Sequence, residues 1–234
     1  TVRYELTGAV QEINKLAKGI AAINEEIARA KGNGQSPNDL LDQRDTLIRN
    51  LNNYVQTSQI PADDGSVGNF VAGSQPLVLG NTATPLSIGD SSEFAGSGKV
   101  KLFFNNPGSA PIELNEDMLG GGEVAGLLRF HNSDLTEGRN LLGRMAVAIS
   151  ETMNAQHKLG VTLDGQVGGN LFTPVALPDA RPGLSNTSGA TIGLAVSDPT
   201  LLAASNYRIS YSAPGVGSLH RESAGKTSQL GPPL

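Results

Sequence analysis

Apolar residues recur at steps of three and four along residues 122–160, a stretch without proline. Such spacing places side chains on one side of a helix, which over this length would be about 55 Å long. Glycines 120–122 precede the pattern, and Gly160 stands where a C′ glycine would end a helix. The pattern predicts one long helix whose apolar stripe packs on the rest of the chain: Leu128, Leu135, Leu142, Met145, Ile149 and Met153.

A second helical pattern covers residues 2–30 and stops at the Gly-Asn-Gly sequence of residues 32–34. Its apolar residues alternate between steps of three and four for more than three heptads, which is typical of a coiled-coil seam. Ser36 and Pro37 are typical of a helix start, with Ser36 as the cap, and they predict a helix through Val55. The short connection favours an antiparallel helical hairpin. The seam consists of Leu6, Ala9, Ile13, Leu16, Ile20, Ile23, Ile27 and Ala30.

Between residues 60 and 112 the apolar runs become short and are separated by glycine, proline and asparagine. This pattern predicts a β-hairpin or meander followed by a strand pair at residues 99–104 and 112–114. Beyond Gly160 we expect a turn-rich segment at residues 162–172, a linker or an extended crossing at 174–189, and strands at 190–196 and 206–212 joined by a short helical turn. Residues after 213 are weakly patterned.

These elements predict an α+β protein: an elongated antiparallel helical bundle with long coiled-coil-like helices, a small inserted β region and a second β-rich domain. We expect a helical rod domain at residues 1–172, with the β insertion at about 60–114. A linker and an incomplete β-rich outer domain are expected at 173–234.

Composition narrows the classes of function. The chain has 234 residues, 4% aromatic residues, a formal net charge of −5 and no cysteine. A net negative charge does not favour binding to nucleic acid or to an anionic membrane. The absence of cysteine excludes disulfides and thiolate metal sites. No apolar run approaches the length of a membrane-spanning helix.

No catalytic or metal-binding arrangement emerges from the candidate residues. His131, His157 and His220 are scattered and no HExxH motif is present, so we expect neither a metal site nor a cofactor. The Asp-Gly pair at 164–165 is typical of a turn, and glycines 120–122 lack the Lys-Ser/Thr ending of a phosphate loop. We therefore expect a protein that is not an enzyme. Asp42, Arg44 and Asp45 are interpreted as a solvated helix face or as a charge-matched contact with a neighbouring helix or subunit.

Three ordered blocks resemble a known family. The sequence LLDQRDTLIRNLNNYV at residues 40–55 resembles the signature helix of FlgK-type flagellar hook-associated proteins. Residues 121–160 resemble a later long helix of that family, including Asn154, Gln156 and His157 near its end, and residues 163–172 are similar as well. The resemblance covers residues 8–211. The assembly and packing candidates in these blocks are Leu40, Leu41, Asp42, Arg44, Asp45, Leu128, Leu135, Leu142, Asn154, Gln156 and His157.

The resemblance implies a structural protein of the bacterial flagellum, at the junction between hook and filament. It implies an extracellular location reached by type III export without a cleaved signal peptide. The implied partners are the hook protein, neighbouring junction subunits, and the export machinery with its chaperone. The family's terminal export and polymerisation helices are not recognised here, so we expect a central piece that is monomeric by itself. The alternatives are flagellin, the second junction protein, or an adhesin or secreted hydrolase on a flagellar scaffold.

Overall fold

The computed structural model describes residues 1–94, 96–175, 179–194, 196, 198, 201–213, 216–223 and 226–230. The chain divides into two compact units. Unit 1 comprises residues 1–92 and 96–132, and unit 2 comprises residues 93–95 and 133–234. Each unit is described by itself.

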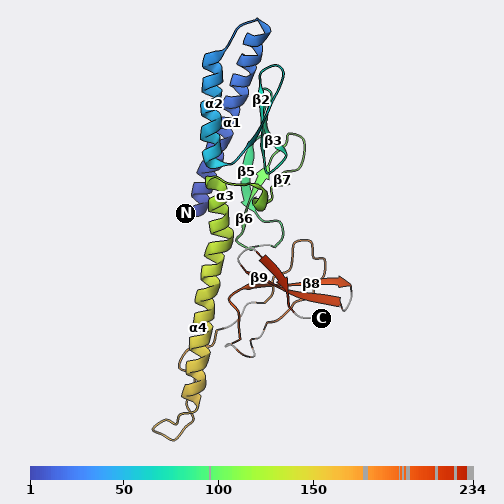
Figure 1. The fold of residues 1–234 in the computed structure, drawn as a ribbon. Helices are drawn as coiled ribbons and strands as arrows, with labels where there is room; N and C mark the ends of the chain where they lie inside the picture. Colours follow the sequence, from blue (N-terminus) through green and yellow to red (C-terminus); the bar gives the residue numbers. More distant parts are fainter. Residues whose placement is uncertain are drawn as a thin grey trace. The chain divides into compact units, whose positions relative to one another are not determined.

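Unit 1 begins with the predicted helical hairpin. Helix α1 (Val2–Gly32) and helix α2 (Asn38–Tyr54) lie side by side in Figure 1. Six of the eight predicted seam residues of α1 are buried, and Ile23 and Ala30 are half-buried. The heptad pattern is therefore confirmed as the packing face of α1. The expected cap is wrong, because Pro37 occupies the N-cap position and no side chain caps the helix.

Two antiparallel sheets follow, as the change of period predicts. The first has the order β1-β2-β3-β4, and the second has the order β5-β6-β7. Leu86 pairs with Phe104 at one end of the β5–β6 register, and Asp90 pairs with Val100 at the other. The strands are β1 (Ser58–Pro61), β2 (Val67–Val71), β3 (Gln75–Leu79), β4 (Thr82–Ala83), β5 (Leu86–Asp90), β6 (Val100–Phe104) and β7 (Ile112–Glu113).

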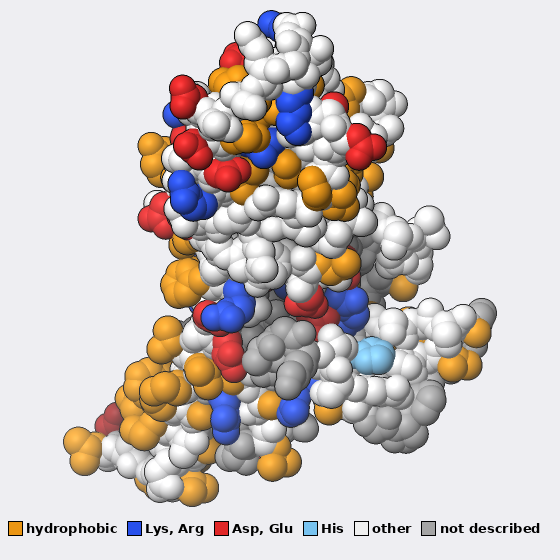
Figure 2. All heavy atoms as spheres, turned by 45° about the horizontal axis from the view of Figure 1, so that its top comes forward, with side chains coloured by type: hydrophobic (Ala, Val, Ile, Leu, Met, Phe, Trp, Pro, Cys, Tyr) orange, Lys and Arg blue, Asp and Glu red, His pale blue; other side chains and the backbone are white. Residues whose placement is uncertain are grey.

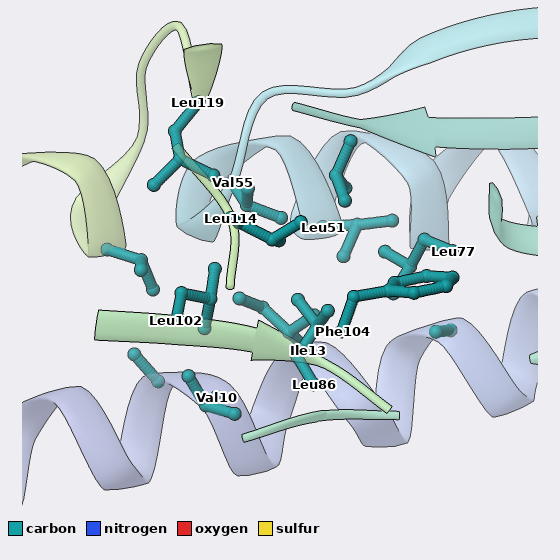
Figure 3. Packing of buried hydrophobic residues seen from close by; sticks show 14 of the residues in the cluster. Val10, Ile13, Leu51, Val55, Leu77, Leu86, Leu102, Phe104, Leu114 and Leu119 are labelled. Atoms are coloured by element: carbon teal, nitrogen blue, oxygen red, sulfur yellow. The ribbon is translucent and has the colours of Figure 1, made fainter. Parts of the chain in front are cut away.

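The helices and strands of unit 1 share one core. Figure 3 shows Ile13 of α1, Leu51 of α2, Leu77 of β3 and Phe104 of β6 directed toward one another, and each is at most 2% exposed. Leu114 and Leu119, on either side of the 3₁₀-helix η1 (Glu116–Met118), belong to the same cluster. Burying a side chain of this size contributes roughly 1.5–3 kcal/mol relative to exposure. The β insertion is therefore an integral layer on the helical hairpin.

The predicted long helix is helical throughout but not regular. It consists of α3 (Glu123–Arg129), the π-helix η2 (Phe130–Asp134) and α4 (Leu135–Lys158). Gly122, with φ of 100°, is required at its start, because a Cβ there would lie 2.6 Å from the Tyr54 carbonyl oxygen. Gly160 does not adopt the left-handed conformation of a C′ glycine, so that expectation is wrong.

Unit 2 contains α4 and a three-stranded antiparallel sheet of order β10-β9-β8, formed by β8 (Asn206–Ala213), β9 (Val216–Ser223) and β10 (Lys226–Gln229). The strand expected at 206–212 is confirmed. Strands β9 and β10 correct the expectation of weak patterning after residue 213. Asn140 of α4 donates to Asn206 Oδ1 at 3.2 Å and links the helix to the sheet.

Other expectations for unit 2 fare less well. Residues 190–194 and 196 form no strand, so the strand expected there is wrong for the described positions. The helical turn expected at 197–204 falls in part on residues 197, 199 and 200, and the linker in part on residues 176–178, all outside the described residues. The chain as a whole is an α+β protein, as predicted.

Candidate assembly surface

The candidates on α2 do not share one environment. Leu40 and Leu41 are half-buried, Asp42 and Asp45 are exposed, and Arg44 is buried with 8% of its surface exposed. The interpretation of Arg44 as part of a solvated face is therefore wrong. Asp42 and Asp45 remain available for a contact with a neighbouring helix or subunit.

Arg44 anchors the turn between β1 and β2. Its Nη1 donates to the Gly65 carbonyl oxygen at 2.7 Å, and its Nε lies 3.8 Å from the Asp45 carboxylate. Gly65 has φ of 87°, and a Cβ there would lie 2.6 Å from the Lys31 side chain. Within the described residues the Nε makes no hydrogen bond, so the bond from Nη1 to the turn and the proximity of the Asp45 charge are what the structure offers the buried guanidinium.

The same turn holds a perturbed carboxyl group. Asp64 Oδ1 accepts from the Ser66 hydroxyl at 2.7 Å and from the Ser66 backbone N–H at 2.8 Å. These hydrogen bonds, the hydroxyl bond first, lower the pKa of Asp64 below its ordinary value of 3.8, because they favour the charged carboxylate.

Asparagine side chains join the helices to the backbone of neighbouring strands and, in one case, of a returning loop. Each of four helical asparagines accepts from a backbone N–H through Oδ1 and donates to a backbone carbonyl through Nδ2, as a neighbouring strand would. Asn14 binds both groups of Leu86 at 2.8 Å, and Asn24 binds both groups of Val67 at 3.1 and 3.0 Å. The other two are Asn132 and Asn154.

The polar side of α4 binds the segment that returns along it. Asn154 Oδ1 accepts from the backbone N–H groups of Leu171 and Phe172 at 2.8 Å, and its Nδ2 donates to the Phe172 carbonyl at 2.9 Å. His157 Nδ1 lies 2.8 Å from the Gly169 carbonyl oxygen. Asn154 is 2% exposed. The two residues therefore have a defined task within this chain: they fix the returning segment to the end of α4.

The returning segment approaches the backbone of α4 so closely at Gly168 that only glycine fits there. A Cβ at Gly168 would clash with the backbone carbonyl of His157, whereas a Cβ at the neighbouring Gly169 would meet nothing. Before it, residues 161–167 form a tight hairpin closed by a bridge between Val161 and Val167. Gln156, by contrast, is exposed on the helix.

The apolar side of α4 is exposed. Leu128 of α3 is buried and Leu135 is half-buried, but Leu142 is 68% exposed and Met145, Ile149 and Met153 are each at least 44% exposed. Figure 2 shows hydrophobic side chains gathered at the lower left of its view, where α4 lies. The expectation that the whole stripe packs on the rest of the chain is therefore wrong for residues 142–153. Exposed apolar surface of this extent is typical of an interaction site.

Unit 1 has a shallow hollow between α1 and α2, with a volume of about 420 Å³. Ile23 and Leu47 provide its apolar lining. Asp42, Gln43 and Thr46 provide its polar lining. Gly19 lies beside it, because a Cβ there would approach the Leu47 side chain to 3.1 Å.

The described residues contain no group of three or more His, Cys, Asp or Glu that could hold a metal ion. His131 lies in the π-helix, where its Nε2 is 2.9 Å from the Gly98 carbonyl oxygen, and His220 is in β9. No helix in the described part of the chain is long and apolar enough to cross a membrane.

Sequence reasoning named Asn154 but missed Asn14, Asn24 and Asn132. A signal was present, because Asn24 stands next to seam residue Ile23 in a helix where an unpaired amide would be costly. The strand that each amide binds could not be read from the sequence.

Comparisons with known proteins relate the two helical blocks to one family. The family model described as "Flagellar hook-associated protein FlgK helical domain" matches residues 1–172. Proteins named flagellar hook-associated protein 1 are similar over most of this chain. The one from Escherichia coli K12 is 34% identical over 90% of this chain, and the one from Salmonella typhimurium LT2 is 36% identical over 89%. The chain spans 38% of the length of these curated relatives.

The fold has a counterpart among solved structures. The flagellar hook junction protein FlgK from Burkholderia pseudomallei aligns with 99% of this chain at a TM-score of 0.81 and 31% identity. The aligned part is 41% of that protein. The similarity therefore includes unit 2, which lies mostly beyond the residues of the family model.

Proposed function

Because this chain belongs to the FlgK family of flagellar hook-associated proteins, we propose that it is a structural segment of the junction between the flagellar hook and filament. The observation that carries the proposal is the match of the family model to residues 1–172, which include both helical blocks. The relatives of this chain are named for an association with the hook, and one is named for the hook junction. The proposed role is mechanical and needs no catalytic residue.

The location and partners follow from this role. The protein is extracellular and reaches the flagellum by type III export without a cleaved signal peptide. Its neighbours are the hook protein and further copies of the junction protein, and the export machinery with its chaperone binds parts of the protein outside these 234 residues. This segment is monomeric by itself.

In this proposal the helices form the rod domain of the junction protein. Residues 1–172 act as the rod domain, in which α1, α2 and α4 contribute to an elongated bundle, and residues 173–234 belong to an outer β-rich domain. The long apolar faces support this arrangement, because a helix with a long apolar face is stable only when another element packs on that face. The exposed side chains of α4 and the acids Asp42 and Asp45 are the candidate assembly contacts.

The role is tested by deleting the gene in its native source and measuring swimming and flagellin in the medium. We expect loss of swimming, with unpolymerised flagellin shed outside the cell, and restoration by the full-length gene. Normal filaments in the deletion strain would contradict the junction role.

The assembly surface is tested in the complementing gene. The double variant Leu142→Ser and Ile149→Ser changes exposed side chains, so it should fold but fail to restore swimming. The control is Leu184→Ser, whose side chain is 59% exposed in the same unit and outside α4. If the double-variant strain swims as well as the Leu184→Ser strain, the α4 face is not an assembly contact. The junction role would then still be tested by the deletion experiment.

A further inference from the structure

The hollow between α1 and α2 combines an apolar lining with an acid that has no partner in the described chain. Its volume is about 420 Å³, and Ile23 and Leu47 line it beside Asp42, Gln43 and Thr46. Asp42 is exposed, and its carboxylate forms no ion pair or hydrogen bond with any described residue. A hollow between two helices is the shape that receives side chains of a third helix.

The exposed side of α4 carries groups that match this hollow. Leu142 is 68% exposed, and Arg139, three residues earlier, is exposed as well. Residues three apart in a helix lie on the same side, so an apolar side chain and a cation are neighbours there. Among the described residues, none pairs with the Arg139 guanidinium. The helix therefore offers a leucine for the apolar lining and a cation for the acid.

The exposed charges of α2 and α4 have opposite signs. The exposed charged residues of α2 are Asp39, Asp42, Asp45 and Arg49. In α4, where every residue is described, the exposed Lys and Arg residues are Arg139, Arg144 and Lys158, and both glutamates are half-buried. Complementary charge favours a contact of α4 with α2, and like charge disfavours a contact of either helix with its own counterpart in another copy.

We propose that the exposed face of α4 in one copy docks on the α1–α2 hollow of a second copy of this chain. Leu142 enters the hollow beside Ile23 and Leu47. Arg139 pairs with Asp42 at its rim. The proposal rests on the flagellar role proposed above, because it names the partner of the same surfaces. The two surfaces differ, so the contact is heterologous, and repeated heterologous contacts build a ring or a helical assembly.

The contact is small, which agrees with a segment that is monomeric by itself. A stable interface buries about 1,200–2,000 Å² in total, and an exposed ion pair adds little affinity. In an assembled junction the same contact recurs at every copy and acts together with contacts made by the rest of the protein.

Exchange of the two charges in the complementing full-length gene tests the pairing. Asp42→Arg and Arg139→Asp each place like charges at the rim of the hollow, so each variant should lose swimming. The double variant restores opposite charges at every contact and should swim like the parent. Both positions are exposed, so the variants should fold.

Co-expression of the two single-variant genes separates a contact between copies from a contact within one chain. Each chain then keeps one of the two original groups, so a contact between copies is satisfied wherever the two kinds of chain alternate. Swimming should therefore improve over either variant alone. A contact within one chain gains nothing from co-expression, so unimproved swimming would overturn the proposal.

The matched control exchanges the neighbouring arginine. Arg144 is exposed on the same helix, but it lies two residues from Leu142 and therefore on a different side. Asp42→Arg with Arg144→Asp should not restore swimming. Restoration by this pair, or no restoration by the pair with Arg139→Asp, would overturn the proposal.

Crosslinking decides the proposal where a charge variant is not exported. Isolated flagella that carry Thr46→Cys and Leu142→Cys in the full-length protein are treated with a short bis-maleimide. We expect covalent dimers and larger multimers of this protein, and none with Thr46→Cys and Arg144→Cys or with the parent protein. The absence of multimers in the first sample, or a crosslink to a different protein instead, would overturn the proposal.

These outcomes are separate from those of the deletion experiment. Normal swimming of the deletion strain would reject the junction role itself. Failed charge exchange in a strain that needs the gene for swimming would reject only the docking of α4 on the hollow.

Discussion

Replacing Asn24 by alanine should destabilise unit 1 far more than an average helix substitution. Asn24 is fully buried on α1 and makes three hydrogen bonds to backbone groups. Its Oδ1 accepts from the Val67 N–H, and its Nδ2 donates to the carbonyls of Val67 at 3.0 Å and Gly80 at 2.9 Å. One side chain therefore connects α1 to the start of β2 and to the turn after β3.

The magnitude follows from these contacts. Three hydrogen bonds at about 1 kcal/mol each give about 3 kcal/mol, and a buried N–H left without a partner adds about 1–3 kcal/mol. The Val67 carbonyl keeps only a contact of 3.4 Å with Asn69 Nδ2. Together these give an expected loss of about 4–6 kcal/mol in the free energy of unfolding, a large fraction of the 5–15 kcal/mol of a typical domain.

Urea unfolding followed by circular dichroism measures this loss. With a slope of about 2 kcal/mol per molar urea, the midpoint should fall by about 2–3 M. The control is Glu26→Ala on the same helix, an exposed position where a change within about 0.5 kcal/mol is expected. A loss below about 1 kcal/mol for Asn24→Ala would refute the view that asparagine clamps hold the strands to the helices.

Three further predictions concern the turns. Gly168→Ala should release the segment that returns along α4, seen as faster amide hydrogen exchange there, whereas Gly169→Ala should not, because only the first Cβ meets the helix backbone. Arg44→Met should lower the free energy of unfolding by about 1–3 kcal/mol through loss of a charged hydrogen bond, and the exposed Arg49→Met should change it by less than about 0.5 kcal/mol. The pKa of Asp64 is lowered in the folded state, so its contribution is present above pH 3.8 and is lost as the pH falls through the folded pKa. The stability difference between the parent and Asp64→Asn should therefore shrink below pH 3.8 in acid titrations; a difference that stays constant would contradict this.

Much of the fold could be predicted from the sequence because the residues of the local apolar patterns are also the residues of the core. The heptads of α1 and the short runs of β2, β3, β5 and β6 place their apolar residues in one core, so periodicity alone located these elements. Strands β9 and β10 were missed because their residues do not alternate clearly between polar and apolar side chains. Such strands form through pairing with a neighbour, which no local pattern encodes.

The candidate residues divide in the same way. The two family-like helices were recognised from their sequence, and Asn154 and His157 lie where the chain returns along α4. The buried state of Arg44 could not be foreseen, since it depends on the Gly65 carbonyl of a turn 21 residues away. The exposure of Leu142 was likewise hidden, because periodicity identifies an apolar face without stating whether anything covers it.

Hydrophobic periodicity was enough to locate the helices and their apolar faces, and the order of the motifs was enough to identify the family. Both signals are local properties of the chain. Folding in three dimensions sets which apolar faces are covered, which asparagines bind backbone groups of distant segments, and where the long helix widens into a π-turn. These features depend on backbone groups that only folding brings close together. Val100 and Asn132, for example, are 32 residues apart in the sequence, and no local pattern predicts their hydrogen bonds.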